Sequence, residues 1–214
     1  PSTARLSEAD PSGLIGFPNP DNAPIITDLL EVALQRSSNS TVPVIYFRAS
    51  AELPTVPTGT LGAATGLYLV DIDAASPDRG QRVPIVAQAL PLDELSGEHL
   101  LAMAPVPGIV LRAGTAYAAV VTTEFAPMFT AAPELRALFA GTPAGRAVAI
   151  ADQTADALMV LNQQGIATDA VVALTTFVTG DPPARVFARS EAVRGQYDVT
   201  VANLQVDPAD GAVL

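Results

Sequence analysis

His99, the single histidine of the chain, is the first residue to examine for catalysis, because an activated serine usually needs an imidazole base. It lies in the sequence GEHLL at residues 97–101, and no G-x-S-x-G motif occurs in the 214 residues. Cysteine and lysine are absent, which excludes a thiolate nucleophile and a Schiff-base amine. We therefore predict no catalytic and no cofactor-binding residue, and interpret His99 as a surface or edge histidine.

Three aspartates are the best candidates for a metal site. Asp71, Asp73 and Asp78 follow the pattern D-x-D-x-x-x-x-D, and oxygen ligands at such spacing suit calcium. The glycine and glutamate that an EF-hand loop requires are missing from their places. The three residues are thus weak calcium candidates, and the favoured interpretation is that Asp71 and Asp73 end a strand and brace the following turn through backbone N–H groups.

The charge balance bears on possible partners. Acidic residues outnumber basic ones by 22 to 11, giving a formal net charge of −11. Nucleic-acid affinity comes largely from Lys and Arg side chains that neutralise phosphates, so we expect no nucleic-acid partner. No apolar run reaches the roughly 18 residues of a membrane span, and we predict no transmembrane segment.

The elements that must position these residues are short and mostly extended. Residues 1–41 are rich in proline, glycine and serine and are predicted to be an irregular leader segment with one helix at 28–35. From residue 42, short β-rich runs alternate with Pro/Gly turns, a pattern typical of an antiparallel sandwich or barrel. The predicted strands cover residues 44–48, 67–72, 82–89, 100–104, 116–123 and 170–178.

Helices interrupt and follow these strands. Periodicity predicts a helical hairpin at about residues 134–165 that ends at Gly165. The apolar run 170–178 is predicted to be a central strand buried on both faces. A helix at 184–193 and a strand at 197–206 follow. The predicted domains are 1–41, a β-sandwich with helical insertion at 42–181, and a connecting segment at 182–214.

Apolar side chains on the 184–193 helix mark a candidate interface. Val186, Phe187 and Val193 stand among three arginines near the end of the chain. An apolar strip without a core of its own is usually an interaction surface. We therefore predict that Val186, Phe187 and Val193 contact a partner.

Three stretches carry a family resemblance: LYLVDIDAASPDRGQRVPIVAQAL at 67–90, LLAMAPVPGIVLRAGTAYAAVVTTEF at 100–125, and VVALTTFVTGDPPARVFAR at 171–189. The middle stretch, through LRAGTAY at 111–117, resembles an apolar hairpin followed by a tyrosine-led strand. In this order the stretches resemble the N-terminal Ig-like module of secreted bacterial lipase- and esterase-like proteins, the bacterial virulence-factor lipase N-terminal family.

The resemblance implies an Ig-like antiparallel β-sandwich in an exported protein, whether periplasmic, cell-surface or extracellular. It implies a downstream or separate α/β-hydrolase domain as partner, which would hold the catalytic residues. The leading hypothesis is a non-catalytic accessory or scaffold module of an exported lipase- or esterase-like hydrolase. Two alternatives are a free-standing adhesion or ligand-binding β-sandwich of the cell envelope, and one piece of a split or processed hydrolase completed by another chain.

Overall fold

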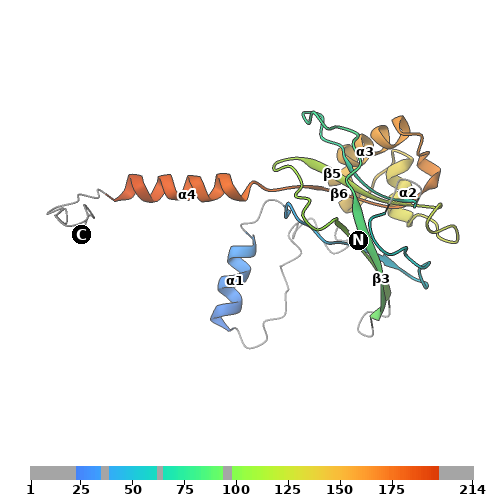
Figure 1. Cartoon of the computed structure of the whole chain (residues 1–214), viewed down its shortest axis with the longest axis horizontal. Coiled ribbons are helices and arrows are strands. Elements are labelled where there is room, and N and C mark those ends of the chain that lie inside the picture. The colour runs from blue at the N-terminus through green and yellow to red at the C-terminus, as the bar shows by residue number, and fades with distance from the viewer. Residues whose placement is uncertain (1–22, 35–38, 62–64, 94–97, 198–214) are drawn as a thin grey trace, which may run out of the picture. The chain divides into compact units, whose positions relative to one another are not determined.

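The computed structural model describes residues 23–34, 39–61, 65–93 and 98–197 (Figure 1). The chain divides into two compact units, Pro1–Gly180 and Asp181–Leu214. All strands of the described part lie in the first unit, and helix α4 (Pro182–Gln196) lies in the second. The limit between the units falls one residue before the predicted domain boundary at 181/182.

The first sheet contains β1 (Ile45–Ala49), β4 (Glu98–Pro105) and β3 (Ile85–Asp93), antiparallel and in that order. In the central strand β4, Met103 is paired with Ile45 of β1 and with Ala87 of β3. Buried and more exposed residues alternate along β1 and along most of β4. This alternation is typical of an antiparallel sheet with one face on a core and one face toward solvent.

The second sheet contains β2 (Leu67–Asp71), β5 (Ala116–Thr122) and β6 (Val171–Val178), also antiparallel. The central strand is β5, so the prediction of a central strand at 170–178 is wrong. Among the described strands, β6 pairs only with β5 and is buried at some positions and half-buried at others. All of β2 and nearly all of β5 are buried.

Apolar side chains of both sheets meet in one core. Phe47 and Leu101 of the first sheet belong to the same buried cluster as Leu69 and Val121 of the second. A second cluster lies between the other face of β2 and β5 and the helix α3, where Val70 and Val120 meet helix residues. The second sheet is therefore covered on both faces.

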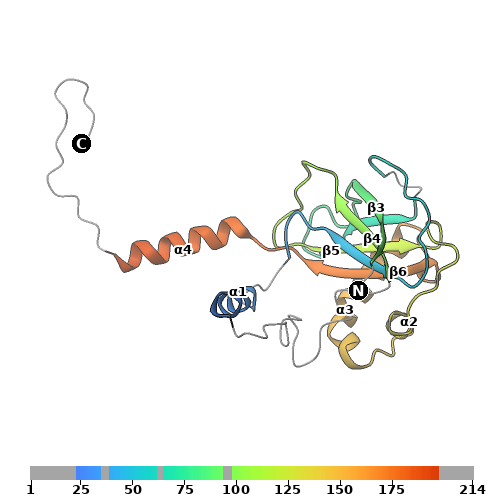
Figure 2. The ribbon, with the colours of Figure 1, turned by 90° about the horizontal axis from the view of Figure 1, so that it is seen from below.

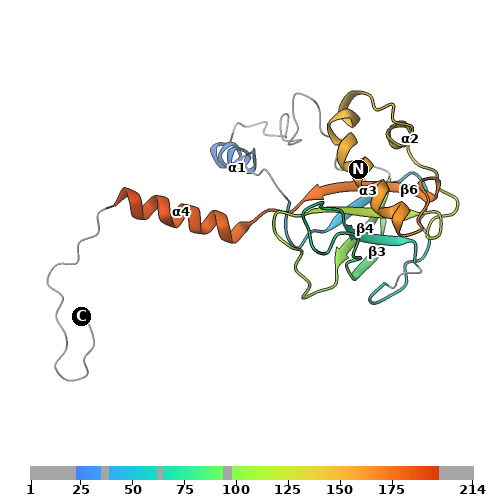
Figure 3. The same ribbon diagram turned by 90° about the horizontal axis from the view of Figure 1, so that it is seen from above.

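Helices connect β5 to β6. They are α2 (Pro133–Phe139), a 3₁₀ helix at Gly145–Ile150, α3 (Ala151–Gln163) and a 3₁₀ turn at Thr168–Ala170. The second helix of the predicted hairpin is thus α-helical only from Ala151, and Gly165 follows its end with a φ of 79°, as expected of a C′ glycine. Figures 2 and 3 show α2 and α3 on one side of β5 and β6, and β3 and β4 on the other.

The remaining helices lie near the two ends of the described residues. Helix α1 (Pro24–Leu34) covers most of the helix predicted at 28–35. Helix α4 begins at its two prolines, and the Asp181 side chain caps it by accepting a hydrogen bond from the Ala184 N–H at 2.9 Å. The predicted strand at 197–206 lies almost wholly outside the described residues. The result is a mixed α+β fold with two small antiparallel sheets and additional helices.

Candidate functional site

A groove lies beside β3, one of the two edge strands of the first sheet. One wall is the extended segment 52–59, with the sequence ELPTVPTG, and the other is formed by residues 87–92 of β3 with His99 of β4. Its volume is about 720 Å³. This volume is within the range of small-ligand sites, and the groove is the candidate functional site.

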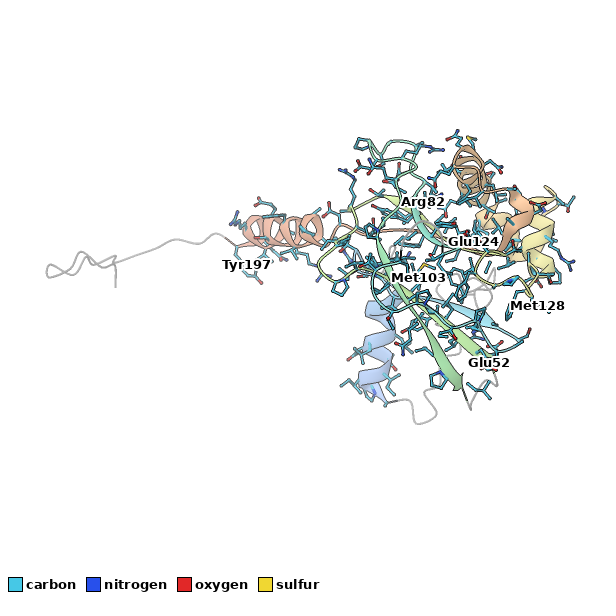
Figure 4. All side chains as sticks on the ribbon, turned by 45° about the vertical axis from the view of Figure 1, so that its right-hand side comes forward. Glu52, Arg82, Met103, Glu124, Met128 and Tyr197 are labelled. Carbon is cyan, nitrogen blue, oxygen red and sulfur yellow. The ribbon has the colours of Figure 1, made fainter. Side chains whose placement is uncertain are left out.

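The polar groups of the groove are few. Glu52 brings a carboxylate, His99 an imidazole, Thr55 and Thr58 hydroxyls, and Gln88 an amide. Figure 4 shows Glu52 near the end of the β3–β4 hairpin. Most other lining side chains are apolar, so the site is suited to bind a ligand through apolar contact and a small number of hydrogen bonds.

His99 occupies an edge position as the sequence suggested. It is half-buried in β4, where it is paired with Ala49 of β1, and it is one of the residues that line the groove. The segment 52–59 was not identified from the sequence. Its two prolines indicate extended backbone. Next to the segment, the Leu61 N–H donates to the Ile85 carbonyl of β3 at 2.8 Å, and Leu53 and Val56 pack against the core of the sheets.

The aspartate cluster braces a turn. One oxygen of the buried Asp71 carboxylate accepts from the Asp73 N–H at 3.0 Å, and the other accepts from the Ser76 hydroxyl at 2.6 Å. The Asp73 carboxylate accepts from the N–H groups of Ala75 and Ala116. These are the backbone hydrogen bonds that the favoured interpretation of the two residues required.

Asp78, the third calcium candidate, pairs with an arginine. Its carboxylate accepts a hydrogen bond from the Arg112 guanidinium, and this carboxylate raises the pKa of Arg112. In the part of the chain that the structure describes, no group of three or more His, Asp and Glu side chains could hold a metal ion. The calcium hypothesis therefore gains no support from this geometry.

A second polar cluster joins the turn after β2 to helix α3. The Tyr68 hydroxyl donates to a Glu124 carboxylate oxygen at 3.0 Å, and the Arg82 guanidinium lies 4.4 Å from the centre of the Tyr68 ring. Arg82 also donates to the side-chain oxygen of Gln164 at 2.7 Å. Burial, with a further contribution from Glu124, raises the pKa of Tyr68. We assign this cluster to holding α3 against the second sheet.

The candidate interface residues lie on α4. Val186, Phe187 and Val193 are 66%, 70% and 54% exposed, and Tyr197, which follows the helix, is also exposed. Spacing of i and i+7 places Val186 and Val193 on one side of the helix, with Phe187 next to Val186. The apolar strip predicted from the sequence thus lies on a helix with its side chains accessible.

Among the described helices, none combines the length and the apolar composition needed to cross a bilayer. No protein-family model, curated protein or solved structure matches the chain. The resemblance to the lipase N-terminal module thus rests on the three stretches quoted above.

Proposed function

We propose that this chain is a non-catalytic accessory module of an exported lipase- or esterase-like hydrolase, and that it binds its partner through α4. The proposed partner is an α/β-hydrolase domain, downstream or on a separate chain. The observation that carries the proposal is the exposure of Val186, Phe187 and Val193 on one helix. The family resemblance supports the identity of the partner.

Helix α4 needs packing contacts to be stable. The helix has 15 residues, and isolated helices of this length are marginal in water, since most helical stability in proteins comes from packing an apolar face. The side chains of Val186, Phe187 and Val193 gain free energy when they leave water. A partner surface that covers this face would therefore stabilise α4 and bind the module at the same time.

Charges on α4 define the surface that it would meet. Arg185 and Arg189, four residues apart, lie on one side of the helix, and Arg194 pairs with Glu191 at 2.9 Å. The helix thus carries three arginines and one glutamate beside its apolar strip, a net positive charge, whereas the whole chain is acidic. The complementary partner surface is an apolar patch with carboxylates at its rim.

We propose further that the first unit is an Ig-like sandwich with α2 and α3 as an insertion between two strands. Two three-stranded antiparallel sheets that share one apolar core support this assignment. The order of the elements along the chain, with a helical segment between β5 and β6, also agrees with the resemblance.

A charge placed on the strip tests the docking proposal. We expect the wild-type chain to bind a hydrophobic dye or to self-associate in sedimentation velocity, because its apolar strip is accessible. Phe187→Asp should abolish this behaviour and leave the melting temperature nearly unchanged. Ala188→Asp, which adds the same charge to another side of α4, is the matched control and should behave as wild type.

Two outcomes would contradict the docking proposal. The first is a wild-type chain that is monomeric and binds no dye. The second is a Phe187→Asp chain whose melting temperature falls by several degrees, because Phe187 would then belong to the core of the module itself.

The groove favours the second candidate function, a free-standing ligand-binding protein of the cell envelope. Such a protein would bind through the groove beside β3 and would not need α4. Two results together would favour this alternative. The groove would bind a ligand equally well in the wild type and in Phe187→Asp, and the chain would show no association that depends on α4.

A further inference from the structure

We infer that the outer edge of β3 binds an extended, basic peptide segment of a partner protein, which adds to the first sheet as a further strand inside the groove. This inference uses the groove alone and does not depend on docking through α4. Strand addition is a common mode of peptide recognition, in which backbone hydrogen bonds give affinity and alternate side chains give specificity.

The hydrogen bonds around β3 show which of its backbone groups face outward. The Val106 N–H donates to the Pro84 carbonyl at 3.0 Å, so even-numbered residues of β3 direct their backbone groups toward β4. The Leu61 N–H donates to the Ile85 carbonyl at 2.8 Å from the other side. Odd-numbered residues therefore direct their N–H and C=O groups away from β4, into the groove.

Two residues offer complete pairing positions at this edge. Ile85 already pairs with Leu61, and Pro91 has no N–H to donate. Ala87 and Ala89 lie between them and line the groove. Together they present two donors and two acceptors, which is enough for two antiparallel residue pairs with an incoming strand.

The described segment 52–59 makes no backbone hydrogen bond to these groups. If its pairing with β3 continued beyond Leu61, Gly59 would face Ala87 and Pro57 would face Ala89, and Pro57 cannot donate. Among the described residues, no backbone hydrogen bond joins 52–59 to β3. The segment forms the far wall of the groove, and the outward groups of Ala87 and Ala89 are the ones that an added strand would meet.

The lining of the groove specifies the incoming peptide. Two residues of the incoming peptide would pair with Ala87 and Ala89. Their side chains would point to the face of the sheet on which Leu53 and Val56 pack against the core, so apolar side chains suit these two positions. The residue between them would lie on the side of Gln88, which is exposed. Glu52 is the charged carboxylate of the described lining, and the chain carries a net charge of −11, so basic flanking residues complement the site.

A designed peptide tests the inference on the full 214-residue chain. The probe is the labelled hexapeptide acetyl-Arg-Thr-Val-Thr-Val-Arg-amide, measured by fluorescence anisotropy. We expect saturable binding that weakens with added salt. The same peptide with N-methyl groups on both valines cannot donate at the paired positions and should lose binding at least tenfold.

Proline substitutions locate the site on the protein. Ala89→Pro removes one outward N–H at an edge, a place where sheets tolerate proline, and should weaken binding about tenfold. Tyr46→Pro places the same change on the opposite edge of the sheet, at a position of β1 that faces away from β4, and should change binding less than twofold. Phe187→Asp should leave peptide binding unchanged, so that failure here and failure of α4 docking are separate results.

Several outcomes would overturn the inference. These are absence of saturable binding to the folded wild-type chain, equal binding of the plain and N-methylated peptides, and equal binding by the wild type and Ala89→Pro. A dimer of the chain that Ala89→Pro dissociates would also overturn it, because the edge would then be occupied by a second copy.

Discussion

The two sheets differ in how completely they are covered. The sheet β2-β5-β6 has the common core on one face and α3 on the other, and its central strand β5 is buried along almost its whole length. Among the residues that the structure describes, the sheet β1-β4-β3 has the core on one face only, and its edge strand β3 borders the groove. The covered sheet is suited to hold the fold together, whereas the partly covered sheet retains surface for binding.

The largest difference between the sheets should appear in stability. Leu69 in β2 is 0% exposed, and Leu69→Ala should lower the free energy of unfolding by about 2–5 kcal/mol, because it removes buried methyl groups and leaves a cavity. Tyr46 in β1 is 49% exposed, and Tyr46→Ala should change the free energy of unfolding by less than about 0.5 kcal/mol. Urea unfolding measures both, and similar losses in the two variants would contradict the comparison.

An intermediate loss is expected at the edge of the covered sheet. Phe177 in β6 is half-buried, and its ring stacks on Tyr117 with 6.0 Å between ring centres. Phe177→Ala should lower the free energy of unfolding by about 1–3 kcal/mol, which is less than the loss of about 3–5 kcal/mol typical of a fully buried phenylalanine. If urea unfolding gave a loss above about 4 kcal/mol, β6 would contribute to the core as much as a central strand does.

A pH dependence should come from two tyrosines of the covered sheet. Burial is the main cause that raises the pKa of Tyr68 and of Tyr117 above the ordinary value of 10.0. The unfolded chain then releases these protons at a lower pH than the folded chain, so stability is fully present below about pH 10 and falls as the pH rises above it. Between pH 8 and 11, the melting temperature should fall less steeply with pH in Tyr68→Phe than in the wild type. Equal slopes in the two proteins would show that Tyr68 does not cause the pH dependence.

The smallest expected effect concerns catalysis in the partly covered sheet. The purified chain should not hydrolyse short p-nitrophenyl esters above the buffer rate, and His99→Ala should give the same trace as wild type. His99 is the single imidazole of the chain, so ester turnover by the wild type that is lost in His99→Ala would show that the groove is an active site.

The sequence predicted strand positions better than strand neighbours. The runs at 67–72 and 116–123 correspond to β2 and β5, since side-chain patterns report which faces of a strand are buried. The run 170–178 has a similar composition but forms an outer strand of its sheet. Neighbours in the plane of a sheet pair through backbone groups, which leave no pattern in the side chains.

The candidate site was less predictable for the same reason. His99 was identified because it is the single imidazole, and Val186, Phe187 and Val193 were identified because they form an apolar strip among arginines. The groove was not found, because its walls at 52–59 and 87–92 are far apart in the sequence, and the backbone hydrogen bond between the neighbouring residues Leu61 and Ile85 leaves no pattern in the side chains. The turn at 71–78 was recoverable, since its hydrogen bonds are local in sequence.

Amide hydrogen exchange of the free chain tests the central claim most directly, because it compares the covered sheet with the binding surfaces in one measurement. The account predicts that β5 amides exchange only through global unfolding. It predicts that the outward amides of Ala87 and Ala89 and the amides of α4 exchange orders of magnitude faster. Protection of Ala87, Ala89 and α4 equal to that of β5 would contradict the account, because these groups would then already be covered in the free protein.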